Sequence, residues 1–106
     1  MKSVIVSMIA AAGLMVAGSV LADDGAALLK KSNCMGCHKM EGKLVGPGFK
    51  EVAMKYKGDA GAEAKLEAKV ANGGAGVWGT MPMPAMKTVK AEDIKTMVTF
   101  ILAQAK

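Results

Sequence analysis

The residues with the most distinctive chemistry form one short run, Cys34-Met35-Gly36-Cys37-His38. Two cysteines three positions apart on a tight turn can each add to one vinyl group of a haem, which forms two thioethers. His38 follows directly, so the covalent attachment itself places an imidazole nitrogen beneath the iron. The spacing therefore predicts one covalently bound haem c, with Cys34 and Cys37 as thioether donors and His38 as an axial iron ligand.

Other uses of these residues fit the sequence less well. A structural zinc site takes four Cys- or His-type ligands, and this chain offers two Cys and one His. A thioredoxin-like redox pair belongs to a βαβ unit, and no segment alternates in hydropathy as a strand does. A disulfide between Cys34 and Cys37 is feasible in an oxidising compartment, but it would close a very small loop and leave His38 unexplained.

A six-coordinate haem iron takes its second axial ligand from the opposite face, and methionine is the available donor. Most methionines have the ordinary role of filling a core. The candidates are Met35, Met40, Met54, Met81, Met83, Met86 and Met97. The first two lie too close to the attachment run to cross the ring, and Met97 belongs to a helical stripe. Prolines on both sides of Met83 fix the backbone there, which favours Met83 without excluding its two neighbours.

The first 22 residues have the composition of an export signal. Lys2 supplies a positive start, an apolar run follows over 4–16, and Ser19-Val20-Leu21-Ala22 has the small-residue pattern that signal peptidases cleave. We expect residues 1–22 to be a cleaved signal peptide and residues 23–106 to form one domain. An uncleaved anchor is the alternative, although a spanning helix needs about 20 apolar residues and this stretch is borderline.

The domain that remains is small, so it buries little side-chain core and needs a staple, a metal or a cofactor. Apolar residues at helical spacing predict four short helices. The first runs from the caps Asp23 and Asp24 toward Ser32, and the second from Phe49 to Tyr56, before Gly58. The third follows a cap at Asp59 and contains Ala62, Leu66 and Val70. The fourth runs from Ile94 to Leu102. Residues 33–48 and 73–86 are rich in glycine and proline and are predicted to be loops. The fold class is all-α.

The formal net charge of the whole chain is +5. Nucleic acid is a poor partner for this sequence, because the lysines are interleaved with acids and lack accompanying stacking aromatics. An acidic protein partner fits better. Six lysines flank the two loops and are expected to ring an exposed haem edge: Lys30, Lys31, Lys39, Lys43, Lys87 and Lys90.

Three further segments accompany the cysteine run: Val45-Gly46-Pro47, Gly76-Val77-Trp78-Gly79 and Pro82-Met83-Pro84. With these segments and the closing helix, residues 23–106 resemble, from end to end, the small bacterial class I cytochromes c of the c-551/c-552 type. The separation of His38 and Met83 also matches the distance between the axial ligands of that family. The resemblance implies the class I cytochrome c fold, in which about four short helices surround one haem.

The resemblance also assigns roles to particular residues. Met83 is implied as the second axial ligand. The carbonyl oxygen of Pro47 is implied to accept the Nδ1 proton of His38, and Trp78 is implied to donate its indole N–H to a haem propionate. Plain packing is the alternative role for Trp78.

Three features depart from the family pattern. Ala85-Met86 stands where relatives often have Pro-Asn, the loop between Met83 and the last helix is one residue longer, and Lys90 replaces a helix-capping Ser. These departures bear on the rigidity of the loop and on the reduction potential, not on ligation. The crossing of the terminal helices is implied at Leu29 and Phe100.

These inferences predict one-electron transfer in the periplasm by a monomer that is not an enzyme, because imidazole and thioether together saturate the iron. The resemblance implies respiratory redox partners, such as a quinol-oxidising complex upstream and a terminal oxidase or nitrite reductase downstream. Two alternatives are open: a haem enzyme or gas sensor in which Met83 leaves the iron, and a Cu(I) carrier that uses Met81, Met83 and Met86 as thioether ligands.

Overall fold

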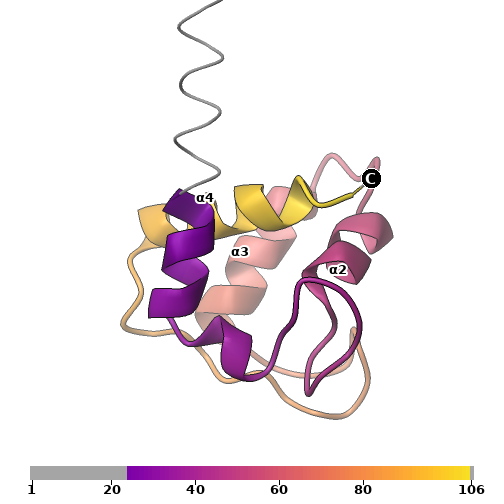
Figure 1. Ribbon diagram of the computed structural model, residues 1–106, viewed down its shortest axis with the longest axis horizontal. Coiled ribbons are helices and arrows are strands. Elements are labelled where there is room, and N and C mark those ends of the chain that lie inside the picture. The colour runs from indigo at the N-terminus through magenta and orange to yellow at the C-terminus, as the bar shows by residue number, and fades with distance from the viewer. Residues whose placement is uncertain (1–23, 106) are drawn as a thin grey trace, which may run out of the picture.

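The chain is described over residues 24–105 by a computed structural model (Figure 1). Helical residues 24–31 are followed by a 3₁₀ turn, η1, at Cys34–Gly36, and then by the helices α2 (Phe49–Lys55), α3 (Ala62–Asn72) and α4 (Ala91–Leu102). The described residues contain no strand, and one isolated antiparallel bridge joins Gly74 to Met83. The predicted all-α class is confirmed. The expected cleavage after Ala22 lies outside the described residues.

The helices begin and end close to the positions that the apolar spacing predicts. Helix α2 ends before a turn at Gly58, whose φ of 84° belongs to the left-handed region. The expected capping of α3 by Asp59 is wrong in detail. Gly61 is the N-cap of α3 and has no side-chain cap, because the Oδ1 atom of Asp59 accepts the backbone N–H of Gly61 itself at 2.8 Å. This Asx-type turn precedes the helix.

Helix α4 begins at a residue that cannot cap it with its side chain. Lys90 is the N-cap and makes no side-chain capping hydrogen bond. Glu92 and Asp93 lie in the first turn, where carboxylates interact favourably with the helix dipole. The two carboxylates therefore offset the stabilisation that a capping hydroxyl would supply at this helix end.

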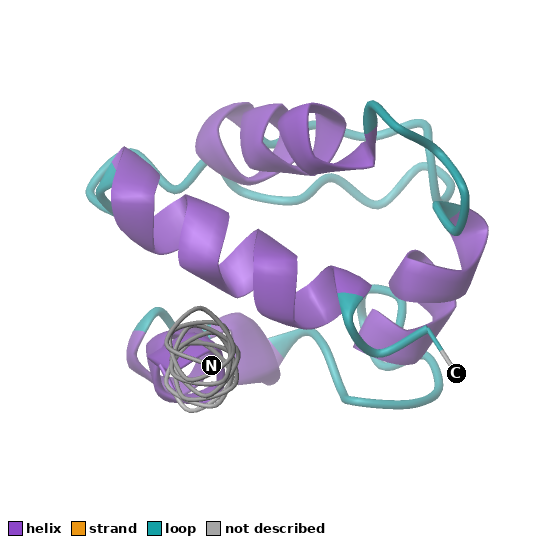
Figure 2. Cartoon of the chain, turned by 90° about the horizontal axis from the view of Figure 1, so that it is seen from above, coloured by secondary structure: helices purple, strands orange, loops and turns teal. Residues whose placement is uncertain are grey.

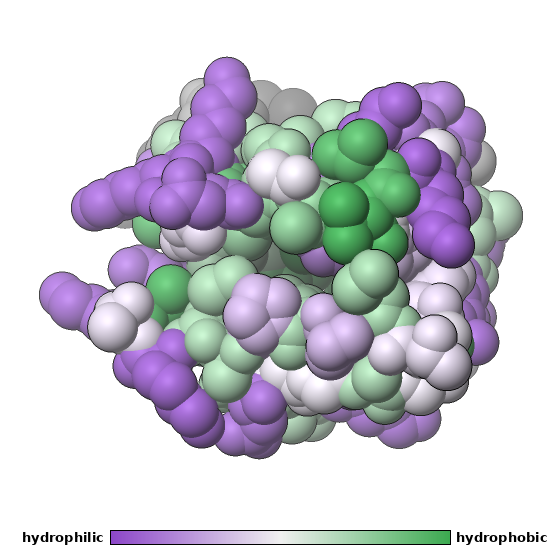
Figure 3. Space-filling view, turned by 90° about the horizontal axis from the view of Figure 1, so that it is seen from below, coloured by the Kyte–Doolittle hydropathy of each residue, from purple (hydrophilic) through white to green (hydrophobic). Residues whose placement is uncertain are grey.

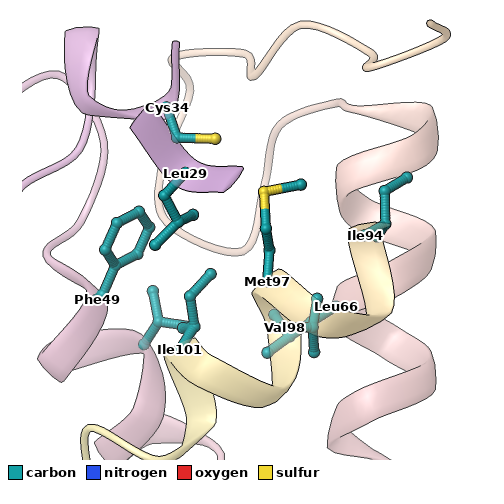
Figure 4. Close-up of a cluster of buried hydrophobic side chains, with 9 residues drawn as sticks. Leu29, Cys34, Phe49, Leu66, Ile94, Met97, Val98 and Ile101 are labelled. Atoms are coloured by element: carbon teal, nitrogen blue, oxygen red, sulfur yellow. The ribbon is translucent and has the colours of Figure 1, made fainter. Parts of the chain in front are cut away.

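The core lies where α4 packs against α2 and α3. Met97 and Val98 of α4 are its most deeply buried large side chains. Figure 4 shows Leu29 and Cys34 pointing into the same cluster from the N-terminal part of the chain. Where the two terminal helices meet, an added Cβ on Gly25 would come within 2.4 Å of the Cβ of Phe100. A glycine is therefore required for this close approach.

Two long loops connect these helices, and no described residue is coloured as a strand (Figure 2). The loop of residues 37–48 and the loop of residues 73–90 both lie on the lower side of the molecule in Figure 1. They carry His38, Trp78 and Met83, so the fold gathers the predicted site residues on one side. No helix within residues 24–105 is long and apolar enough to cross a membrane.

Candidate functional site

The two cysteines lie on one turn but in different surroundings. Cys34 opens η1 and is buried in the core cluster, whereas Cys37 is exposed, and both are free thiols. Burial raises the pKa of the Cys34 thiol, so this side chain stays neutral near pH 7. The backbone N–H of His38 donates to the carbonyl of Cys34 at 2.9 Å. This bond closes the turn that holds both thiols and the imidazole together.

The imidazole of His38 is held on three sides. Its Nδ1 atom lies 2.7 Å from the carbonyl oxygen of Pro47, which is the hydrogen bond that the family resemblance implies. The Phe49 ring stacks on it at 5.1 Å between centroids and 23° between planes. Gly46 lies against it, because an added Cβ there would approach the His38 Cε1 atom to 2.6 Å. With Nδ1 engaged as donor, Nε2 is the nitrogen left with a lone pair for a metal.

The backbone of the 37–48 loop is folded against itself. The carbonyl of Cys37 accepts the N–H groups of Val45 at 3.1 Å and Gly46 at 2.7 Å, and Lys39 accepts from Phe49 at 2.9 Å. We call this loop with Phe49 the His38 wall. Its internal bonds fix the position of the Pro47 carbonyl relative to the ring.

Met83 belongs to a second wall, formed by residues 73–86. Its backbone N–H and carbonyl exchange hydrogen bonds with Gly74, both at 2.9 Å. Gly73 lies so close that an added Cβ would be 2.4 Å from the Met83 carbonyl oxygen. Met81 is 67% exposed, whereas Met83 and Met86 are half-buried. We call this segment the Met83 wall, and it is anchored to the end of α3.

Trp78 is not packed in the interior. It is 43% exposed, and the Nζ atom of Lys55 lies over its ring at 5.4 Å from the centroid. Its ring borders an open groove of about 500 Å³ between α2 and the 73–90 loop, lined by Lys50, Glu51, Met54, Lys55 and Trp78. Packing alone does not account for this position, and an exposed indole N–H is free to meet an anionic acceptor.

The donor set fits a c-type haem. Two thiols, an imidazole whose Nδ1 atom faces the Pro47 carbonyl and a thioether lie on the loop side of the molecule. Glycines stand where a Cβ would obstruct the imidazole or the Met83 backbone. Figure 3 shows this side from below: it is hollowed between two lobes, apolar residues line much of the hollow, and hydrophilic residues lie at its margins. An apolar hollow with a few placed polar donors is typical of a cofactor site.

Comparison with known proteins supports this assignment. The family model "Cytochrome c" matches residues 22–105. The chain is 53% identical to cytochrome c-551 of Allochromatium vinosum over 82% of its own length and 90% of that protein. It is 38% identical to cytochrome c-551 of Pseudomonas aeruginosa over 98% and 99% of the two chains. The chain belongs to the cytochrome c family.

The structural comparison agrees. The crystal structure of wild-type cytochrome c552 from Nitrosomonas europaea has a TM-score of 0.72 and 42% identity, covering 74% of this chain and 98% of that one. The class I cytochrome c fold is thereby confirmed, as is covalent haem c with its iron as the cofactor. The relatives are small electron-transfer haem proteins. These matches favour electron transfer through haem over the Cu(I) carrier that the three methionines suggested.

Two residues that contact His38 or its loop were absent from the site that the sequence predicted. Phe49 was predicted only as part of a helical stripe, yet it stacks on the imidazole of His38. Phe49 lies two residues after Pro47, whose carbonyl is implied to contact His38, and this nearness was the signal in the sequence. Glu51 accepts hydrogen bonds from the backbone of Gly42, and nothing in the local sequence pattern pointed to it.

Proposed function

We propose that this cytochrome is a periplasmic carrier of single electrons whose haem iron is held by His38 and Met83. Residues 1–22 act as the signal peptide, and residues 23–106 form the mature domain. Cys34 and Cys37 supply the two thioether bonds. The 2.7 Å contact between the Nδ1 atom of His38 and the Pro47 carbonyl carries the proposal, because it fixes the tautomer and orientation that an axial imidazole requires.

When bound, the haem iron supplies a ferric–ferrous couple, and a thioether opposite an imidazole favours the ferrous form. The chain's own residues set the surroundings of that couple. The Pro47 carbonyl orients the His38 ring, and the bridge to Gly74 holds the backbone of Met83. Trp78 offers an indole N–H to a propionate. With His38 and Met83 both bound to the iron, a substrate would find no free coordination position, so the role that we propose is electron transfer.

The partners are redox proteins of the respiratory chain, such as a quinol-oxidising complex as donor and a terminal oxidase or nitrite reductase as acceptor. Lys39 and Lys43 in the His38 wall, with Lys87 just beyond the Met83 wall, favour an acidic docking site. Hydrophilic residues also lie at the margins of the hollowed face (Figure 3). The exposed apolar residues Leu44, Val45 and Met81 offer an apolar alternative. The carrier acts as a monomer, which gel filtration of the mature protein tests.

Substitution of the methionines tests the ligation. Met83→Ala should abolish the weak far-red band from sulfur to ferric iron and lower the reduction potential. Met81→Ala and Met86→Ala are the matched controls and should keep the band. If Met86→Ala alone removes it, the ligand is Met86 and the longer loop has shifted the register.

The covalent link and the export signal are tested together on protein from the periplasm. Haem with peroxidase activity should migrate with the chain on a denaturing gel, and the N-terminal residue should be Asp23. Haem that extracts into acidified organic solvent contradicts the thioether assignment. A chain that still begins at Met1 and sediments with membranes contradicts the cleavage.

A further inference from the structure

We propose that Glu51 is a positioning residue for the axial histidine: it clamps the tip of the 37–48 loop to helix α2 and thereby holds the Pro47 carbonyl on His38. The inference rests on the proposed role of His38 as iron ligand. Among the described residues, the hydrogen bonds of the Glu51 side chain go to Gly42 and not to His38, so we infer that it acts through the loop.

The clamp is a bifurcated contact between one carboxylate and one backbone N–H. The N–H of Gly42 donates to the Oε1 atom of Glu51 at 2.7 Å and to its Oε2 atom at 3.2 Å. Hydrogen bonds to an ionised acceptor are shorter and stronger than neutral ones. Among the described residues, the ion pairs join Lys50 to Glu41 and Lys65 to Asp59, and none involves Glu51.

The position of Glu51 makes this use of its side chain unusual. It is the third residue of α2, where a glutamate commonly bonds back to the N-cap of its own helix. The N-cap here is Gly48, and no side-chain capping bond is made. The carboxylate reaches instead to a residue nine positions earlier in the chain.

The loop is shaped to admit the carboxylate. An added Cβ on Gly48 would lie 2.5 Å from the Oε2 atom of Glu51 and 2.7 Å from both the nitrogen and the oxygen of Gly42. Gly42 itself has a φ of 82°, a conformation that side chains other than glycine rarely adopt. Two glycines therefore allow the loop tip, the carboxylate and the start of α2 to meet at one point.

A short chain of bonds connects this point to the imidazole. Beyond Gly42, the N–H of Leu44 donates to the Gly46 carbonyl at 3.0 Å, and the Gly46 N–H donates to Cys37 at 2.7 Å. Pro47 comes next and accepts from His38. Without the clamp, the described hydrogen bonds that tie the loop tip to α2 are those of the Phe49 and Lys50 N–H groups to loop carbonyls. The exposed 3.7 Å ion pair of Lys50 with Glu41 adds a weaker tie. We expect the Pro47 carbonyl to become less well fixed.

The test compares three variants of the haem-loaded protein. Glu51→Ala removes both the charge and the acceptor, and Glu51→Gln removes the charge but keeps an amide oxygen. Glu41→Ala removes one charge from the same loop, where the carboxylate is 72% exposed and makes only a 3.7 Å ion pair with Lys50. The readouts are the exchange rates of the Gly42 amide and of the His38 Nδ1 proton in the ferrous protein by NMR, and the reduction potential.

Glu51→Ala should raise both exchange rates by tenfold or more, whereas Glu51→Gln should raise them less and Glu41→Ala should leave them unchanged. Because a weaker bond to Pro47 makes the imidazole a poorer electron donor, the potential of Glu51→Ala should exceed that of Glu51→Gln at equal charge. Faster exchange at Gly42 with an unchanged rate at His38 overturns the proposal, as do equal potentials for the two Glu51 variants.

Failure of the proposed function is distinguishable. If His38 and Met83 are not the axial ligands, the protein that keeps Glu51 will lack the far-red sulfur band, or Met83→Ala will leave that band unchanged. The Glu51 comparison is then not reached. If the ligands are correct, every Glu51 variant keeps the band and only the exchange rates and the potential decide.

Discussion

Alanine at Gly73 should detach the Met83 wall from α3. Gly73 has φ 68° and ψ −156°, a region that is almost confined to glycine and that costs other residues about 1–3 kcal/mol. The new Cβ would also lie 2.4 Å from the Met83 carbonyl oxygen and 2.8 Å from the Ala85 nitrogen. Both are backbone atoms, so relief requires the loop to move.

Movement of the loop breaks the two 2.9 Å hydrogen bonds between Gly74 and Met83, at about 1 kcal/mol each. Strain and lost bonds together destabilise the protein by about 3–5 kcal/mol. Gly76→Ala is the matched control. Its φ is 113° but no atom lies within 4 Å of an added Cβ, so it carries strain alone. The two variants should differ by about 2 kcal/mol, which is about thirtyfold in an equilibrium constant.

The assay is guanidinium unfolding of the ferric protein, followed in parallel at the main haem absorption and at the far-red sulfur band. In Gly73→Ala the sulfur band should be lost at a clearly lower denaturant concentration than the main transition. In Gly76→Ala the two transitions should stay closer together. The opposite outcome is that the free energies of unfolding of the two variants agree to within about 0.5 kcal/mol, with the sulfur band intact in both. That result would refute the argument that an added Cβ at Gly73 displaces the Met83 carbonyl.

Three further predictions concern other parts of the molecule. Phe49→Ala should destabilise the protein by about 3–5 kcal/mol in thermal or chemical unfolding, because Phe49 is 3% exposed and stacks on the imidazole of His38. Phe49→Leu should cost less. The pKa of Asp59 is lowered by its hydrogen bond to Lys65. The ionised carboxylate therefore stabilises the fold above the ordinary carboxyl pKa, and this stabilisation is lost as pH falls through the lowered pKa. Asp59→Asn should thus destabilise the protein at pH 7, and its difference in stability from the parent should vanish in strong acid. Oxidation of the ferrous protein by the anion hexacyanoferrate(III) should slow as salt rises, since screening is strong beyond roughly 8 Å at physiological ionic strength. Lys31→Glu or Lys87→Glu should slow the oxidation further at low salt. A rate that is independent of salt would contradict electrostatic steering by these lysines.

The helices were predictable because their apolar stripes have to be buried. Phe49, Val52 and Ala53 repeat at helical spacing, and α2 buries these three. The same holds for Ile94, Met97, Val98 and Ile101 in α4. The attachment run was predictable for a different reason. Its chemistry requires two thiols and an imidazole at fixed spacing, so the residue order itself carries the information.

The details that depend on the tertiary path were not predictable. The 3₁₀ turn at Cys34–Gly36 has three residues, too few for any periodicity to appear. Aspartate is a common N-cap residue, but the Asp59 side chain accepts the backbone N–H of Gly61, and Gly61 itself is the N-cap of α3. Glycines are equally ambiguous in sequence. Only the folded path shows that Gly46 faces the imidazole and that Gly73 faces the Met83 carbonyl.

The two walls differ from the core in how they hold together. The hydrogen bonds that build the His38 wall join residues close together in the chain, as His38 and Pro47 are. The Met83 wall is likewise bonded within itself and to the end of α3. Closing such short loops costs little entropy, so each wall forms as a local unit.

No hydrogen bond among the described residues links one wall to the other. A local opening of one wall therefore breaks no hydrogen bond of the other. The His38 wall belongs to the same short stretch as both thioether attachments. If Met83 is the ligand that we propose, a local opening of the Met83 wall would release it while the Pro47 carbonyl still holds the His38 ring.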